Sequence, residues 1–351
     1  MPDSTPAPTP KPAGSPEPGP APTPAPTPTP EPDSTPAPTP APELTPAPGL
    51  TPAPLPNGVL LVDKPGGITS HDVVARARRA LNTRKVGHAG TLDPMATGLL
   101  ILGVGPATRL LTFIVGLDKT YEATIRLGVA TDSDDADGIE TARADAGALA
   151  ATSDEAIVAG VAALTGEISQ VPSTVSAIKV GGKRAYDLAR AGEQVELKSR
   201  DVTVSRFDIV ATRREQGAID LDVVVDCSSG TYIRALARDL GAALGVGGHL
   251  AALRRTRIGP FQVTDAATEI TPGMPLRSPA GVAAVVLGAL PVAADEARDL
   301  RHGKVLAGAA ARLAPGHPTP AAIDPEGRLV GIVERRGDGL KSAMNLAEDA
   351  S

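Results

Sequence analysis

The most restrictive feature of this 351-residue chain is its proline-rich beginning, because 23 of its 36 prolines lie in the first 56 residues. Proline fixes φ and has no amide hydrogen to donate, so closely spaced prolines exclude regular helices and central strands. Ala and Thr fill most other positions, which leaves little apolar surface to offset the chain entropy of folding. We therefore expect residues 1–56 to be a disordered, partly polyproline II tail.

The sequence shows no pattern that would direct it into or across a membrane. Its start lacks the basic residues and the apolar stretch of about 7 to 15 residues that mark a secretory signal. No later apolar run approaches the roughly 20 residues of a membrane span. The only cysteine, Cys227, excludes an internal disulfide or a thiolate zinc cluster. We expect a cytoplasmic protein without a membrane partner.

Charge is distributed unevenly along the chain. The formal net charge is -6, of which the proline-rich tail contributes -4, so the remainder is nearly neutral. Residues 57–109 carry seven Lys or Arg against three Asp, whereas residues 131–155 carry eight acidic residues and one Arg. This separation of basic and acidic segments is compatible with RNA binding and equally with ordinary solvent-exposed surfaces.

Apolar periodicity beyond residue 57 predicts strands and helices in mixed order. A helix capped by Thr69 or Ser70 should bury Val73, Val74 and Ala77 on one face. Residues 131–150, acidic and rich in Ala and Gly, are expected to form a loop. Further helices are predicted at 107–115, 156–164 and 231–244, and strands at 59–62, 99–104, 121–127, 175–180, 202–210 and 219–225.

Because strands and helices do not alternate strictly, we expect an α+β fold with a mixed, largely antiparallel sheet. Residues 322–323 and 329–333 flank the turn sequence Asp324-Pro325-Glu326-Gly327, which predicts a hairpin. We therefore expect a first folded domain over residues 57–285 and a small β-rich domain over residues 286–346.

The common cofactor and metal motifs are absent or incomplete. Gly103-Val104-Gly105 is followed by Pro106, and Thr108 stands where a dinucleotide motif needs its third glycine. No P-loop is present, and the five histidines lack metal-ligand spacing. The acidic run 133–138 lacks the glutamate of a calcium loop, so a solvated loop is expected there. Any chemistry should be acid–base or nucleophilic, without cofactor or metal.

Asp93 stands in a segment whose backbone is strongly constrained. Gly90 permits unusual backbone angles, and Pro94 confines the preceding Asp93 to extended conformations, so the carboxylate is presented from a defined loop. Asp-Pro is also a common turn opener whose carboxylate only accepts a backbone hydrogen bond. The segment alone is compatible with both roles.

Several blocks taken together resemble the bacterial tRNA pseudouridine synthases of the TruB family. They occur in family order over roughly residues 57 to 260, whereas the C-terminal similarity is weak and the tail lies outside it. Residues 170–175 depart from the pattern, which often has a second proline and an aromatic there. The blocks are Gly58–Pro65, Thr69–Val74, Lys85–Gly98, Lys119–Tyr121, Leu127–Gly128, Ser176–Lys179, Arg184–Tyr186, Cys227–Arg234, His249–Leu250 and Leu253–Arg255.

The resemblance implies a pseudouridine synthase fold with Asp93 as catalytic aspartate and Arg234 as its ion-pair partner. The reaction breaks the C1'–N1 bond of uridine, turns the base and rejoins it through C5. An ionised aspartate can attack C1', add to C6 or remove a proton from C2', and these alternatives stay open. A nearby guanidinium would orient the carboxylate and lower its pKa.

The resemblance also implies residues that contact the substrate, because a uridine inside folded tRNA must be extruded to react. Tyr121 matches a catalytic-pocket residue that stacks on the flipped base, and His88 one that helps to extrude it. Tyr232 and Leu253 match pocket-lining residues. Lys64, with other basic residues near the site, could follow the RNA phosphates. Simpler roles as core or loop residues compete with these.

The implied substrate is uridine 55 in the T arm of tRNA, acted on by a monomer that needs no nucleotide cofactor. Two other classes of protein remain as alternatives. One is a non-catalytic RNA-binding or tRNA-folding protein on the same fold. The other is a proline-rich structural protein, which only the tail suggests.

Overall fold

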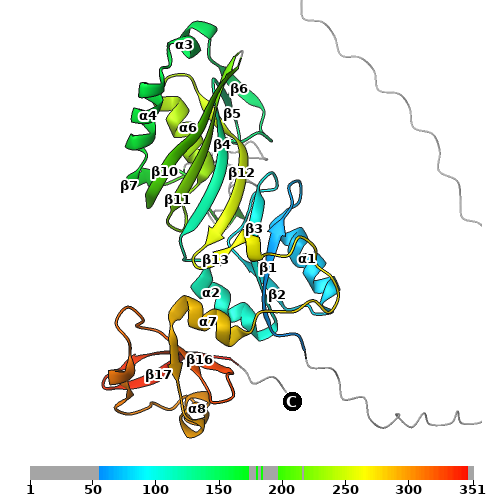
Figure 1. Ribbon diagram of the computed structural model, residues 1–351, viewed down its shortest axis with the longest axis vertical. Coiled ribbons are helices and arrows are strands. Elements are labelled where there is room, and N and C mark those ends of the chain that lie inside the picture. The colour runs from blue at the N-terminus through cyan, green and yellow to red at the C-terminus, as the bar shows by residue number, and fades with distance from the viewer. Residues whose placement is uncertain (1–54, 174–178, 181–182, 185–196, 216, 347–351) are drawn as a thin grey trace, which may run out of the picture. The chain divides into compact units, whose positions relative to one another are not determined.

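The structure is a computed structural model that describes residues 55–173, 179–180, 183–184, 197–215 and 217–346 (Figure 1). The predicted tail therefore lies almost wholly outside the described residues. The same holds for most of the strand predicted at 175–180 and for residues 176–178 and 185–186 of the family blocks.

One large mixed sheet organises residues 58–262. Its strands follow the order β1-β3-β12-β4-β11-β10-β7, with β2 beside β3 and β13 beside β12. Among the described strands of this sheet, only β12 and β3 pair in parallel, at Arg254↔Thr97 and Arg255↔Gly98. The predicted α+β class with a mixed, largely antiparallel sheet is confirmed. The strands are β1 (Gly58–Lys64), β2 (Val86–Ala89), β3 (Thr97–Val104), β4 (Lys119–Leu127), β7 (Gly166–Gln170), β10 (Arg200–Glu215), β11 (Ala218–Cys227), β12 (Gly248–Ile258) and β13 (Phe261–Gln262).

Two helices cover one face of the strands β4, β10, β11 and β12 (Figure 1). They are α4 (Asp154–Ala163) and α6 (Ile233–Ala243). Leu236 and Leu240 of α6 are fully buried against Ile125 and Leu221 of the sheet, so the helix packs on the sheet through one apolar face. This packing leaves the N-terminal end of α6 beside the loop between β2 and β3.

Helix α1 (Ser70–Ala80) packs on β1 and β3 through Val73, Val74 and Ala77, as predicted. Thr69 caps it and exchanges hydrogen bonds with Asp72 in a capping box. The segment after β3 forms a 3-10 helix, η1 (Gly105–Leu110), followed by α2 (Leu111–Ile114). A second 3-10 turn, η2 (Val263–Asp265), follows β13.

The prediction of a loop at residues 131–150 holds for residues 132–139 and is wrong for the regular elements on either side of them. A small hairpin of β5 (Val129–Thr131) and β6 (Glu140–Arg143) occupies its first part, and α3 (Ala146–Ala151) follows. All four residues of β6 are exposed, so the strand lacks the apolar alternation by which sequence patterns reveal strands. A further short hairpin joins β8 (Lys179–Val180) to β9 (Lys183–Arg184).

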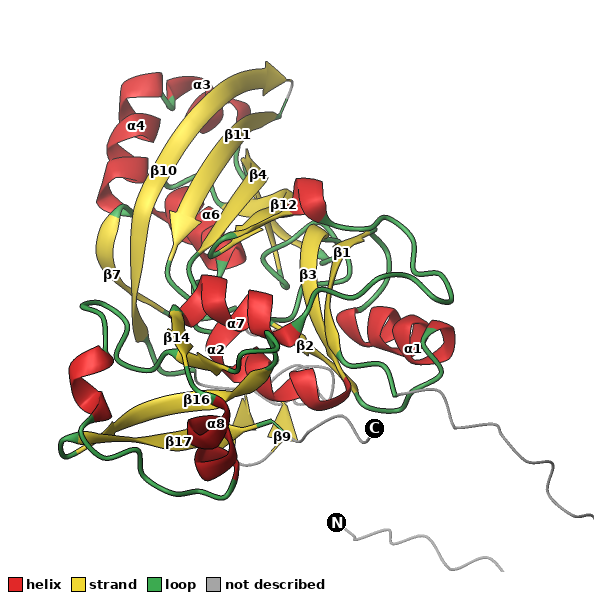
Figure 2. Ribbon diagram, turned by 60° about the horizontal axis from the view of Figure 1, so that its bottom comes forward, coloured by secondary structure: helices red, strands yellow, loops and turns green. Residues whose placement is uncertain are grey.

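A second sheet, ordered β14-β15-β16-β17, lies near the C-terminal end (Figure 2). The predicted hairpin at residues 322–333 is present as antiparallel β15 and β16. Its core is formed by residues such as Leu300, Val330 and Leu340, each 0% exposed. The elements here are α7 (Pro279–Leu287), β14 (Ala289–Pro291), α8 (Ala294–Arg301), η3 (Ala309–Arg312), β15 (Ala321–Ile323), β16 (Leu329–Arg336) and β17 (Gly339–Asn345).

Candidate active site

Asp93 lies in the short loop that joins β2 to β3. Gly90 begins this loop with a φ of +82°, and Gly98, with a φ of +102°, follows it in β3. A Cβ on Gly98 would lie 2.2 Å from the carbonyl oxygen of Arg255 on the parallel neighbour β12. Glycine is therefore required at residue 98 both by its backbone angle and by the closeness of the two strands.

Hydrogen bonds from the start of α1 hold the Asp93 loop in place. The Ser70 Oγ accepts from the Leu92 amide at 2.9 Å and lies 3.2 Å from the Leu92 carbonyl, to which it donates. The Gly67 amide donates to the Pro94 carbonyl at 2.8 Å. The residues flanking Asp93 are thus fixed on both sides, which limits the directions its carboxylate can take.

Lys64 occupies a different position from the one expected of a phosphate contact. Its side chain is fully buried, and Nζ donates to the carbonyls of Ile68 at 2.8 Å, Pro65 at 3.0 Å and Pro94 at 3.3 Å. Burial lowers the pKa of Lys64 from 10.5 to about 8, although Asp93 opposes this change. Lys64 therefore supports the Asp93 loop through the Pro94 carbonyl, and its charge is not exposed to solvent.

Arg255 supports the same loop from β12 and was not singled out by the sequence reasoning. Its side chain is buried, and the guanidinium donates to the carbonyls of Leu99 at 2.8 Å, Gly90 at 3.1 Å and Thr91 at 3.4 Å. Five N–H donors in a planar group suit arginine to several acceptors at once. Its only signal in the sequence was its place in the Leu253–Arg255 block.

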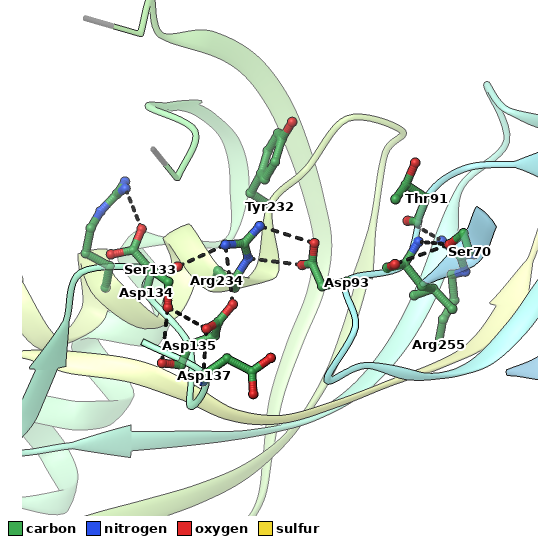
Figure 3. Close-up of polar contacts among 12 residues, drawn as sticks. Ser70, Thr91, Asp93, Ser133, Asp134, Asp135, Asp137, Tyr232, Arg234 and Arg255 are labelled. Atoms are coloured by element: carbon green, nitrogen blue, oxygen red, sulfur yellow. Dashed lines mark hydrogen bonds and ion pairs between the residues drawn. The ribbon is translucent and has the colours of Figure 1, made fainter. Parts of the chain in front are cut away.

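Arg234 and Asp93 form a two-point ion pair, drawn in Figure 3. The Nε of Arg234 lies 3.0 Å from Oδ2 of Asp93, and Nη2 donates to Oδ1 at 3.3 Å. The Arg234 side chain is only 4% exposed, whereas that of Asp93 is 35% exposed. The guanidinium is therefore an internal support, and the carboxylate it orients still faces open space.

The prediction of a solvated loop at residues 133–138 is wrong for residues 133–135, which are buried. The Ser133 carbonyl accepts from Nη1 of Arg234 at 2.9 Å, and Oδ2 of Asp135 lies 3.4 Å from the same nitrogen (Figure 3). One turn along α6, Arg238 pairs with Asp134 at 3.1 Å. Two arginines four residues apart thus match two consecutive aspartates, a pattern that could have identified Asp135 from the sequence.

The charge state of Asp93 results from opposing effects. Burial raises the pKa of Asp93 above its ordinary value, Arg234 lowers it, and the carboxylate of Asp135 raises it again. Because about a third of the Asp93 side chain is exposed, water moderates the effect of burial. The arrangement can therefore hold an ionised carboxylate beside a pocket, with its acidity set by two named neighbours.

Asp93, Tyr121, Tyr232, Arg234 and Leu253 line a single pocket of about 290 Å³, so the structure brings five of the seven expected site residues together. The side chain of Tyr121 is buried, and burial raises its pKa, so its hydroxyl stays neutral near pH 7. The remaining lining residues are Gly90, Thr91, Leu92, Val115, Lys119, Ser228, Ser229, Gly230, Thr231, Ile233 and Arg255.

His88 does not line this pocket but lies on β2, two residues before Gly90. Its ring meets the ring of His71 edge to face, with centroids 5.5 Å apart and planes at 84°. Burial lowers the pKa of His88, and the neighbouring His71 and Arg255 lower it further. A neutral imidazole is therefore favoured at this position of β2.

In the described part of the chain, no three His, Cys, Asp or Glu side chains gather as a metal site would require. Over the same residues, every helix is too short or too polar to span a membrane.

Comparison with known proteins finds relatives that match most of the chain. Residues 78–233 match the N-terminal domain of TruB family pseudouridylate synthases, and residues 287–347 match a tRNA pseudouridine synthase II C-terminal domain. The tRNA pseudouridine synthase B of Leifsonia xyli is 57% identical over 295 residues, which are 84% of this chain and 97% of that protein. The chain belongs to the TruB family. The resemblance inferred from the sequence blocks is confirmed.

Other TruB proteins show the same relationship. The tRNA pseudouridine synthase B of Corynebacterium aurimucosum is 54% identical, over 82% of this chain and 95% of that protein. Membership in TruB makes this chain a tRNA pseudouridine synthase, an isomerase. A chain in the structure of an H/ACA RNP bound to a substrate RNA containing 2'-deoxyuridine shares the fold, with a TM-score of 0.58 and 23% identity over 84% of this chain and 86% of that one.

Proposed function

We propose that this enzyme converts uridine 55 in the T arm of tRNA to pseudouridine and that Asp93 is its catalytic carboxylate. The observation that carries the proposal is the Asp93–Arg234 pair at the wall of the pocket. It combines a buried cation with a carboxylate that is 35% exposed. Such a pair keeps a carboxylate ionised and oriented toward the space that a flipped nucleotide would occupy.

Isomerisation needs no oxidant, reductant or cofactor. The C1'–N1 bond breaks and a C1'–C5 bond forms. The proton lost from C5 is balanced by one gained at N1. Ionised Asp93 serves each of the three routes open to it, attack on C1', addition to C6 or removal of the C2' proton. The fixed loop and the two-point contact with Arg234 keep the carboxylate in position while the base turns.

The other pocket residues would hold the uracil ring. Tyr121 offers an aromatic face on which the extruded base can stack, an interaction worth about 1 to 3 kcal/mol per base in single-stranded nucleic-acid complexes. Tyr232 and Leu253 enclose the same space from α6 and β12. We assign His88, with its neutral ring near the loop, a contact that helps to extrude the nucleotide.

We further propose that residues 57–285 form the catalytic domain and that residues 286–346 form an RNA-binding domain of PUA type. The core around Leu300, Val330 and Leu340 supports this division, and a second core cluster, which includes Leu99 and Ile332, joins the two domains. Exposed Arg76 and Arg79 on α1 are candidates for phosphate contacts. We also propose that the enzyme acts as a cytoplasmic monomer.

The experiment compares wild-type protein with Asp93→Asn on a T-arm hairpin that contains uridine 55. Wild-type protein should convert that uridine, whereas the variant should bind the hairpin with similar affinity and form no pseudouridine. A hairpin with cytidine at position 55 is the matched control for the modified site. Undiminished conversion by Asp93→Asn, or modification at another uridine, would contradict the proposal.

A further inference from the structure

Gln170, the last residue of β7, is a buried amide whose hydrogen bonds go to one pocket residue. Its side chain is about 1% exposed. Oε1 accepts from the main-chain amide of Tyr232 at 2.8 Å, and Nε2 donates to the main-chain carbonyl of the same residue at 3.0 Å. A side-chain amide can satisfy both backbone groups of one residue in this way because it carries a donor and an acceptor side by side.

The strand beside Gln170 contacts Tyr232 as well. Arg200 of β10 is the cross-strand partner of Gln170 in the sheet. Its guanidinium carbon lies 5.4 Å from the centre of the Tyr232 ring, within the range of a cation–π contact. The main chain of Tyr232 is thus held by β7, and its ring is held by β10.

Tyr232 is the N-cap residue immediately before α6, and its side chain makes no capping hydrogen bond. Two residues further on, Arg234 makes the two-point contact with Asp93. One turn later, Nη2 of Arg238 donates to the carbonyl of Val171, the residue after Gln170. Residues 170 and 171 therefore fix the first two turns of α6 relative to the sheet.

We propose that Gln170 is a positioning residue for the isomerisation, because its amide sets the placement of Tyr232 and, through the first turn of α6, that of Arg234. Gln170 is not among the residues that line the pocket, so it acts on the reaction only through Tyr232 and α6. The inference rests on the proposed roles of Tyr232 and Arg234. It predicts a loss of rate without a matching loss of RNA binding.

The first test replaces the amide with an apolar side chain of similar size, Gln170→Leu. The single-turnover rate at saturating T-arm RNA should fall by about 10- to 100-fold, the scale expected when reacting groups are displaced by about 1 Å. The dissociation constant for the RNA should change by less than about threefold. Val330→Ala, in the core of the C-terminal sheet, is the control for a loss of stability far from the pocket.

The second test uses Gln170→Glu, which can imitate the amide only when protonated. A neutral carboxyl group donates to the Tyr232 carbonyl and accepts from its amide, whereas an ionised one repels the carbonyl. The rate of the variant relative to wild type should therefore rise as the pH falls from 8.5 to 5.5. Arginine keeps its charge throughout this pH range, so a change in the ratio reports the new carboxyl group and not Arg200 or Arg238 on the neighbouring elements.

A ratio that does not change with pH, or a Gln170→Leu rate within twofold of that of Val330→Ala, would overturn the proposal. Should Gln170→Leu fail to fold, the pH dependence of Gln170→Glu still decides the question. Wild-type protein that left uridine 55 unmodified would instead count against the proposed function. The rates relative to wild type can then be measured on whichever uridine the enzyme modifies, which keeps the two failures distinguishable.

Discussion

Arg234 contacts the carboxylate of Asp93 through two nitrogens, Nε at 3.0 Å from Oδ2 and Nη2 at 3.3 Å from Oδ1. The remaining nitrogen, Nη1, lies 3.4 Å from a carboxylate oxygen of Asp135 and donates to the Ser133 carbonyl. One buried cation is therefore shared by two carboxylates, of which only Asp93 lines the pocket. Arg234 lowers the pKa of Asp93 and Asp135 raises it. Variants of these two residues can therefore separate the two effects.

Replacing the cation by Arg234→Met should raise the pKa of Asp93. Burial already raises it, and the variant removes the main group that lowers it. Less Asp93 is then ionised at a given pH, so the acidic limb of the pH–rate profile should move to higher pH. The limiting rate should fall by about 100-fold or more, as when a preorganised charged group is lost. Single-turnover rates from pH 5 to 9 measure both effects.

Asp135→Asn should shift the same limb in the other direction. The carboxylate of Asp135 raises the pKa of Asp93, so its removal lets Asp93 ionise at lower pH. The limiting rate should still fall, because Arg234 loses one of the groups that orient it. Asp137→Asn is the control, since Asp137 is an exposed neighbour in the same loop. Movement of the limb to higher pH in Asp135→Asn would contradict this account.

How far the sequence predicts the fold depends on whether burial follows a simple period. Helix α1 was predicted because Val73, Val74 and Ala77 recur at helical spacing and Thr69 caps it. Strand β12 was missed, because register shifts after Leu250 and Arg255 break its alternation. Its buried Arg255 also looks like a surface residue when only polarity is considered.

The site was predicted to the extent that family motifs carry its residues. Asp93 and Arg234 were expected to meet, although they lie 141 positions apart in the sequence. The approach of Asp135 to the same arginine was not predicted, because an acidic run is usually solvated. The ammonium of Lys64 was expected at the surface for the same reason. The arginine that Asp135 contacts lies in a distant segment, whereas two of the three carbonyls that accept from Lys64 lie one and four residues after it.

Lys64 should make the stability of the protein depend on alkaline pH. Burial lowers its pKa from 10.5 to about 8. Between these values the unfolded chain holds a proton that the folded protein has released, so this contribution to the free energy of unfolding increases with pH. Below about pH 8 both states hold the proton and the contribution is constant. Urea unfolding of wild type and Lys64→Met at pH 7 and pH 9.5 measures it.

The difference in unfolding free energy, wild type minus Lys64→Met, should be larger at pH 9.5 than at pH 7. Lys119, whose pKa burial also lowers to about 8, is present in both proteins and cancels from the comparison. A difference that stays constant or shrinks with rising pH would show that Lys64 keeps its proton in the folded protein.

Arg255 and its neighbour Arg254 offer a matched pair for testing support of the Asp93 loop. Arg255 is buried and donates to three carbonyls. The Arg254 side chain is 37% exposed and pairs with Asp63. Lysine has no planar fork with which to reach all three carbonyls, so Arg255→Lys should leave at least one acceptor unsatisfied, at a cost of about 1 to 3 kcal/mol. Arg254→Lys weakens a part-exposed pair, which is worth about 0.2 to 1 kcal/mol.

The two lysine variants should therefore differ in both stability and rate. Arg255→Lys should lower the melting temperature more than Arg254→Lys does, and it should slow the single-turnover reaction even well below that temperature. The reason is that two of its acceptors, the carbonyls of Gly90 and Thr91, belong to the loop that carries Asp93. If the two variants lost equal stability and equal rate, the contacts from Lys64, Gly67 and Ser70 would be enough to hold the loop, and the support assigned to Arg255 would be wrong.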